Sequence, residues 1–143
     1  MVTTSLLRFA LCAALMLPLA ACGSDTPTDS ATVAASYRAT TFRVTPSGQS
    51  AIDVLSSGGT LTVTINADRS TTGALSLPAS VTGGAPLTAS MAGTTVQTSN
   101  TLRLQQTADT FVRDLTWSVG SNALTVTDQQ AGSARFTIVL ARQ

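Results

Sequence analysis

Few side chains in this chain could perform chemistry: two cysteines, Cys12 and Cys22, and seven aspartates, with no histidine, lysine or glutamate. Cys22 closes the segment Leu19-Ala20-Ala21-Cys22, at the end of an apolar stretch. If that stretch is cleaved off, Cys12 leaves with it and Cys22 remains as a lone thiol. A lone thiol in an oxidising compartment is a liability unless it is covalently occupied. The position therefore predicts a covalent modification of the Cys22 thiol.

The apolar stretch runs from Phe9 to Cys22 and is preceded by one positive charge, Arg8. About 14 helical residues span only ~21 Å, which is short of the ~30 Å hydrocarbon core of a bilayer. A charged start, a short apolar stretch and small residues at its end are typical of a secretory signal. Pro18 would break the helix just before the cut. The sequence therefore predicts a cleaved signal peptide at residues 1–21.

The segment Leu19-Ala20-Ala21-Cys22 resembles the lipobox of bacterial lipoproteins. The resemblance implies a diacylglyceryl thioether on Cys22 and an acyl group on its amine. Two or more acyl chains hold a protein stably on a membrane, at ~0.8 kcal/mol per buried methylene. Gly23 and Ser24 follow, so no acidic residue stands next to the cysteine, which by analogy favours the outer membrane, facing the periplasm. A plain secretory peptide cut near Ala20-Ala21 is the alternative.

The charges of residues 22–143 balance, since every remaining arginine is matched by an aspartate. A neutral, dispersed pattern gives no electrostatic reason to expect nucleic acid or anionic lipid as a partner. The segment 22–35 is small, polar and contains proline, and predicts a flexible tether. Residues 36–143 have the length of one domain.

From Ser36 onward, apolar and polar residues alternate with a period of two, which predicts strands. The cleanest strand is 60–66, in which Leu61, Val63 and Ile65 face one side and threonines face the other. Further strands are expected at 37–45, 70–77, 87–96, 101–106, 109–119, 124–126 and 135–141, with a loop at 79–86. About eight antiparallel strands, each with one apolar face, favour an all-β, up-and-down barrel. A two-sheet β-sandwich fits the same strand count.

Three segments, 37–45, 61–68 and 108–115, resemble the small lipocalin-like (calycin-type) barrels of bacterial lipoproteins of uncharacterised function. The resemblance implies an eight-stranded barrel and no catalytic signature. Two features depart from it. Arg69 stands where related sequences commonly carry glycine after an Asn-Ala-Asp turn, and Trp117, the one tryptophan, lies far from the first strand, where lipocalins carry theirs.

The residue types available argue against catalysis and against a bound cofactor. Without histidine or glutamate, a zinc or copper site lacks its usual ligands, and scattered aspartates do not form a calcium loop. The serines and threonines have no histidine or lysine to act as their base. Asp109 and Asp114 are five residues apart on the predicted strand and so fall on opposite faces, which does not suit a glycosidase pair. We expect no enzyme, no metal and no cofactor.

The candidate binding residues are the large side chains predicted to face inward: Phe42, Phe111, Arg113 and Trp117. They could line a pocket for a small apolar ligand, with Arg113 orienting it. Three interpretations of Arg113 are open: a ligand-orienting cation, a structural arginine bonded to carbonyls or Asp109, or a solvent-facing residue after a bulge. At the level of the protein, two interpretations stay open. One is a tethered ligand-binding barrel, and the other is an envelope structural or protein-interaction module with a solid core.

The acylation of Cys22 predicts a simple labelling result. Cells fed labelled palmitate should label the wild-type protein and the Cys12→Ser variant equally, because Cys12 is removed with the signal peptide. The Cys22→Ser variant should carry no label and should leave the membrane fraction. Label that persists on the Cys22→Ser variant would contradict this assignment.

Overall fold

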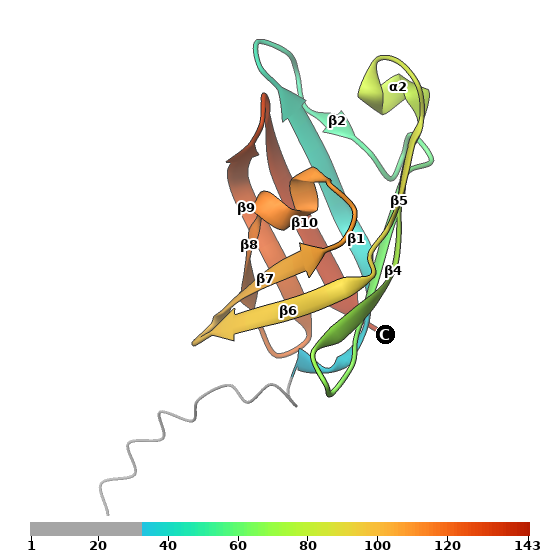
Figure 1. Cartoon of the computed structure of the whole chain (residues 1–143). Helices are drawn as coiled ribbons and strands as arrows, with labels where there is room; N and C mark the ends of the chain where they lie inside the picture. The colour runs from blue at the N-terminus through green and yellow to red at the C-terminus, as the bar shows by residue number, and fades with distance from the viewer. Residues whose placement is uncertain (1–32) are drawn as a thin grey trace, which may run out of the picture.

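Alternating apolar and polar residues produce a closed antiparallel β-barrel with very little helix (Figure 1). The computed structural model describes residues 33–143. The strands are β1 (Ala35–Pro46), β2 (Ile52–Asp53), β3 (Thr60–Ile65), β4 (Ser70–Leu77), β5 (Leu87–Ser90), β6 (Gly93–Thr98), β7 (Thr101–Gln106), β8 (Thr116–Val119), β9 (Ala123–Ala131) and β10 (Ala134–Arg142). Two short helices interrupt them: α2 (Ala79–Thr82) and a 3-10 helix, η1 (Phe111–Asp114).

The barrel closes because its last strand pairs with its first. β10 runs antiparallel to β1 from Tyr37↔Arg142 to Pro46↔Ala134, and the two lie side by side in Figure 1. Eight strands form the ring, and each pairs with the next in the order β1, β3, β4, β6, β7, β8, β9 and β10. The two short strands lie outside this order: β2 pairs with β1, and β5 pairs with β4. The predicted eight-stranded, up-and-down antiparallel barrel is confirmed, and the sandwich alternative is wrong because the sheet is continuous.

The core is formed by the inward faces of the strands. Leu61, Val63 and Ile65 of β3 are buried, as their alternation predicted. The largest fully buried side chains are Trp117, Phe42, Leu61, Leu75, Met91, Leu102, Leu104, Leu115, Leu124, Ile138, Leu140 and Val54. The Tyr37 hydroxyl donates to the carbonyl oxygen of Val33 over 2.9 Å. Burial raises the pKa of Tyr37, partly offset by the charge of Arg142.

A β-bulge in β1 changes which residues of that strand face inward. Before the bulge the odd positions Tyr37 and Ala39 are buried, and after it the even positions Phe42 and Val44 are buried. The register with β10 shifts between Ala39 and Thr41, so one extra residue is accommodated there. A single extra residue turns the following side chains to the other face of the sheet. Both halves of β1 therefore contribute to one core.

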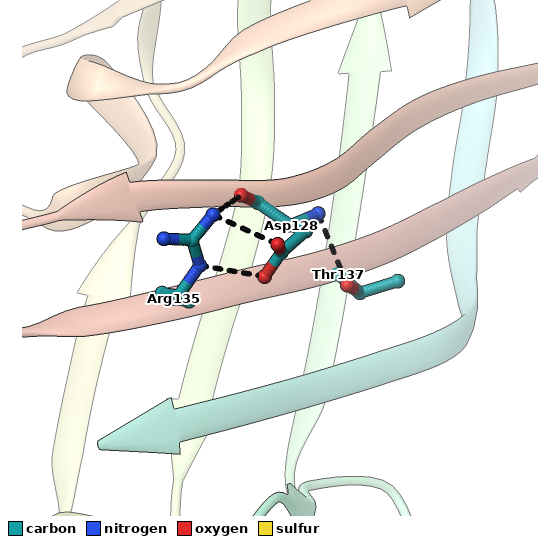
Figure 2. Close-up of polar contacts among 3 residues, drawn as sticks. All are labelled: Asp128, Arg135 and Thr137. Atoms are coloured by element: carbon teal, nitrogen blue, oxygen red, sulfur yellow. Dashed lines mark hydrogen bonds and ion pairs between the residues drawn. The ribbon is translucent and has the colours of Figure 1, made fainter. Parts of the chain in front are cut away.

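A second bulge, in β9, is held by an arginine clamp made of Asp128, Arg135 and Thr137 (Figure 2). Asp128 has a φ of 48°. The Arg135 guanidinium donates to both carboxylate oxygens of Asp128, at 2.7 and 2.8 Å, and to its carbonyl oxygen at 2.9 Å. The Asp128 backbone N–H donates to the Thr137 hydroxyl. The Arg135 hydrogen bond lowers the pKa of Asp128 and raises the pKa of Arg135.

The turn after β3 explains how Arg69 replaces the glycine common in related sequences. Arg69 has a φ of 69°, and its N–H donates to the carbonyl oxygen of Asn66 at 3.0 Å. Asp68 accepts hydrogen bonds from the backbone N–H and the hydroxyl of Ser70, at 2.9 and 2.6 Å, which lower its pKa. The Asn66 amide also donates to the Ser70 hydroxyl. This local network stabilises the left-handed backbone conformation of Arg69, which residues other than glycine rarely adopt.

Three smaller expectations differ from the structure. The expected loop at 79–86 contains the one-turn helix α2, which Pro78 precedes and Gly83 ends with a φ of 70°. β6 buries Thr95 and exposes Val96, because the odd-numbered positions continue to face inward from Met91 to Thr95 without a change of phase. β9 extends to Ala131, five residues beyond the strand expected at 124–126.

Residues 1–32 lie outside the described residues, and they include the predicted signal peptide (1–21), Cys22 and most of the predicted tether (22–35). The chain enters the barrel at the same end as its C-terminus, where the Gln143 N–H donates to the carbonyl oxygen of Ser36 (Figure 1). Between residues 33 and 143, no helix is long and apolar enough to cross a membrane.

The arginine clamp predicts a pH-dependent contribution to stability. Because folding lowers the pKa of Asp128 below 3.8, its contribution is complete above that pH and is lost as the pH falls through the lower folded pKa. The Asp128→Asn variant should therefore unfold at a lower temperature than wild type near pH 6, and the difference should shrink towards about pH 2. Thermal unfolding followed by circular dichroism measures both curves.

Asp68→Asn is the matched control, since Asp68 is also an exposed carboxylate with a lowered pKa but has serine rather than arginine as its partner. Adding salt should weaken the effect of Asp128→Asn more than that of Asp68→Asn. If the difference in unfolding temperature between wild type and Asp128→Asn stays constant from neutral to acid pH, the stabilising role of the clamp is contradicted.

Candidate functional site

The wall of the barrel is interrupted between β7 and β8 by the 3-10 helix η1. Thr110 precedes it in an extended conformation, and the Leu115 N–H donates to the carbonyl oxygen of Val112 at 3.4 Å. In a 3-10 helix, residues three apart lie on the same side. Val112 and Leu115 are accordingly both buried, whereas Arg113 and Asp114 are exposed. The predicted strand at 109–119 is therefore wrong, and only Thr116–Val119 is a strand.

An aromatic cluster of Phe42, Phe111 and Phe136 lies beside this interruption. The rings of Phe111 and Phe136 stack with their centroids 4.2 Å apart and 6° between their planes. Phe42 lies 6.2 Å from Phe111 with a tilt of 46°. The three side chains come from β1, η1 and β10, and Phe111 is the only one that is not fully within the core. Phe42 and Phe111 were predicted as site residues, whereas Phe136 was not.

Trp117 is fully buried on β8, where it pairs with Leu102. Its indole nitrogen has no hydrogen-bond partner in the described part of the chain. Among residues 33–143, the contacts between aromatic rings are those within the aromatic cluster, and none of them involves Trp117. Trp117 therefore faces inward as predicted but is not brought into the aromatic cluster.

Arg113 does not share the inward face, so the prediction that it lines the interior is corrected. Its side chain is 46% exposed and forms an ion pair of 3.4 Å with Asp109, which is fully exposed. The physical reason is η1: the helical turn points residue 113 away from Val112 and Leu115. An exposed ion pair of this kind contributes little to stability. Of the interpretations that the sequence left open, the contact with Asp109 is present.

A polar residue at the end of β7 lies in the barrel interior, although it was not among the candidate binding residues predicted from the sequence. Gln106 is 3% exposed, and neither the nitrogen nor the oxygen of its amide has a hydrogen-bond partner in the described residues. The hydroxyl of Thr110, next to Phe111, is buried without a partner as well. The alternation through Leu102 and Leu104 places Gln106 on the inward face, so the same parity could have identified it.

The other interior-side amide nearby, Gln129, has both of its atoms satisfied. Its oxygen accepts from the Thr116 N–H at 2.9 Å, and its nitrogen donates to the Thr116 carbonyl oxygen. The side chain thereby replaces a pair of backbone hydrogen bonds that is missing between β8 and β9, at the residue where β8 begins after η1. Gln129 thus has a structural role that accounts for its amide, whereas no such role accounts for the amide of Gln106.

Three hollows of the described surface are open to solvent. One of about 350 Å³ lies outside η1 and is lined by Arg103, Gln105, Asp109, Arg113 and Asp114. Two of about 240 Å³ lie beside β1, one near Leu55 and Gly59 and the other between the loops at Ser47 and Ser133. Within residues 33–143, no group of three cysteine, histidine, aspartate or glutamate side chains gathers in a way that could hold a metal ion.

Comparisons with protein-family models, curated proteins and solved structures found no match to this chain. The functional argument therefore depends on the chain's own residues. The closed barrel is compatible with the lipocalin-like resemblance of the sequence.

Proposed function

We propose that this protein is a non-catalytic, lipid-anchored barrel of the bacterial cell envelope that binds a small, mainly apolar molecule inside its wall. Cys22 carries the acyl chains, and the barrel lies on the periplasmic side of the outer membrane. The binding site is the aromatic cluster of Phe42, Phe111 and Phe136, next to η1.

The observation that carries the proposal is the position of Phe111. This ring is presented by a four-residue helix that interrupts the barrel wall, and it stacks on Phe136 of the last strand. A short 3-10 helix makes fewer and weaker backbone hydrogen bonds than a strand ladder, so it can move aside at lower cost. Aromatic rings supply large apolar contact areas for a ligand. Displacing η1 would open the aromatic cluster without opening the barrel.

A second function, that of an interaction module with a solid core, is favoured by a different observation. The inward side chains bury one another, and the hollow of about 350 Å³ is lined mainly by exposed charged and polar residues. In that case, a partner protein would bind the outer face or the loops, and the aromatic cluster would serve packing alone.

Native mass spectrometry of the protein extracted from membranes in mild detergent distinguishes the two functions. If a ligand binds the aromatic cluster, wild type should carry an additional small-molecule mass that is lost on denaturation. Phe111→Ala should lose most of this mass, because the stacked ring that covers the ligand is gone. Leu87→Ala is the control, since Leu87 is an exposed apolar residue on β5, away from the cluster.

Circular dichroism establishes that both variants are folded before their masses are compared. Wild-type protein that carries its acyl chains but no further small molecule would contradict ligand binding. A protein partner bound to such an empty barrel would support the interaction module instead.

A further inference from the structure

We propose that the barrel interior recognises a neutral carboxamide or lactam group through Gln106 and Thr110, on the connection that leads to Phe111 of the aromatic cluster. The inference rests on the proposed function and names the class of ligand that the site takes: a small molecule with an apolar part and one amide-like group.

Gln106 stands out among the buried polar residues. The described chain buries three polar side chains, those of Thr71, Thr95 and Gln106. The Thr71 hydroxyl donates to the carbonyl oxygen of Met91 at 2.7 Å, and the Thr95 hydroxyl donates to that of Arg69 at 3.4 Å. Of these three side chains, that of Gln106 alone has no hydrogen-bond partner among the described residues. Buried polar groups in folded proteins are nearly always hydrogen-bonded, so this amide calls for a partner.

The backbone prevents Gln106 from turning outward to satisfy its amide in water. Gln106 pairs with Gly93 of β6, and the Thr107 N–H donates to the carbonyl oxygen of Ala92 at 2.9 Å. A Cβ at Gly93 would collide with the carbonyl oxygen of Gln105 and would lie 2.6 Å from the Cα of Gln106. The two backbones therefore approach closely, and this contact holds the register that points Gln106 inward.

Thr110 supplies a second polar group next to the aromatic cluster. It occupies the N-cap position of η1, yet its side chain makes no capping hydrogen bond. Its hydroxyl is buried without a partner, and the following residue is Phe111. A single short connection, from the end of β7 to the start of η1, thus carries Gln106, Thr110 and the stacked ring.

The chemistry of these groups selects a neutral ligand. An amide presents a donor and an acceptor side by side, which match the oxygen and nitrogen of another amide. Charged heads are disfavoured, because the core within residues 33–143 buries no charged side chain and Arg113 lies outside, paired with Asp109. A carboxylate or ammonium placed at Gln106 would be buried without an ionic partner.

Two probes of similar size test this inference: benzamide, which carries the amide, and toluene, which does not. Nuclear magnetic resonance titrations of the full lipidated protein in detergent micelles would measure both affinities, with empty micelles correcting for partitioning. Wild type should bind benzamide about tenfold more tightly than toluene, and benzamide should shift the side-chain amide resonance of Gln106. Gln106→Met should lose this preference and keep its affinity for toluene.

Gln105→Met is the matched control, because Gln105 is the exposed neighbour on the same strand, and it should behave as wild type. If the amide is retained for binding, Gln106→Met should also unfold at the same or a higher temperature, since it removes an unpartnered buried polar group.

The outcomes separate this inference from the proposed function. Toluene binding with no preference for benzamide would overturn the amide site and leave apolar binding standing. Binding of neither probe would overturn the amide site and count against the proposed function as well. If Gln106→Met does not fold, the wild-type preference and the shift of the Gln106 resonance still decide the question.

Discussion

The antiparallel pairing of β1 with β10 is the interaction on which the rest of this structure depends. It joins the two ends of the described chain, turns an open sheet into a ring and leaves the main wall without an exposed edge. The closure places a condition on both strands, because their inward faces must match along their full length. The bulges in β1 and β9 meet this condition by bringing both halves of each strand into one core. The arginine clamp then holds the second bulge from outside.

The wall departs from a regular ladder between β7 and β8. There, η1 replaces part of a strand, Phe111 reaches across to Phe136 of β10, and Gln129 substitutes for a missing backbone pair. In most of a folded protein the local sequence follows the rules of its fold, such as pairing every buried polar group, and exceptions to these rules tend to occur at functional sites. The unpartnered amide of Gln106, on the connection that leads from β7 to Phe111, is such an exception. It concentrates the proposed binding site in one short connection.

The sequence predicted the elements whose pattern is strictly local. The period of two through Leu61, Val63 and Ile65 was sufficient for β3, and the same pattern repeated along the chain was sufficient for the barrel. The prediction failed at 109–119, because Phe111, Arg113 and Leu115 alternate as a strand would, while Val112 and Leu115 equally fit one turn of 3-10 helix. Only tertiary packing decides between the two patterns. The error moved Arg113 inside. Gln106 was missed separately, although parity along β7 placed it inward.

Closure of the ring is tested most directly by nuclear Overhauser effects between backbone protons of β1 and β10 in solution. The structure predicts cross-strand contacts for the pairs Tyr37↔Arg142, Phe42↔Ile138 and Val44↔Phe136, with a one-residue slip between Ala39 and Thr41. Contacts at these pairs, together with those between β7 and β8, would establish a continuous ring. Their absence, with slow exchange confined to separate groups of strands, would show an open sheet and contradict the barrel.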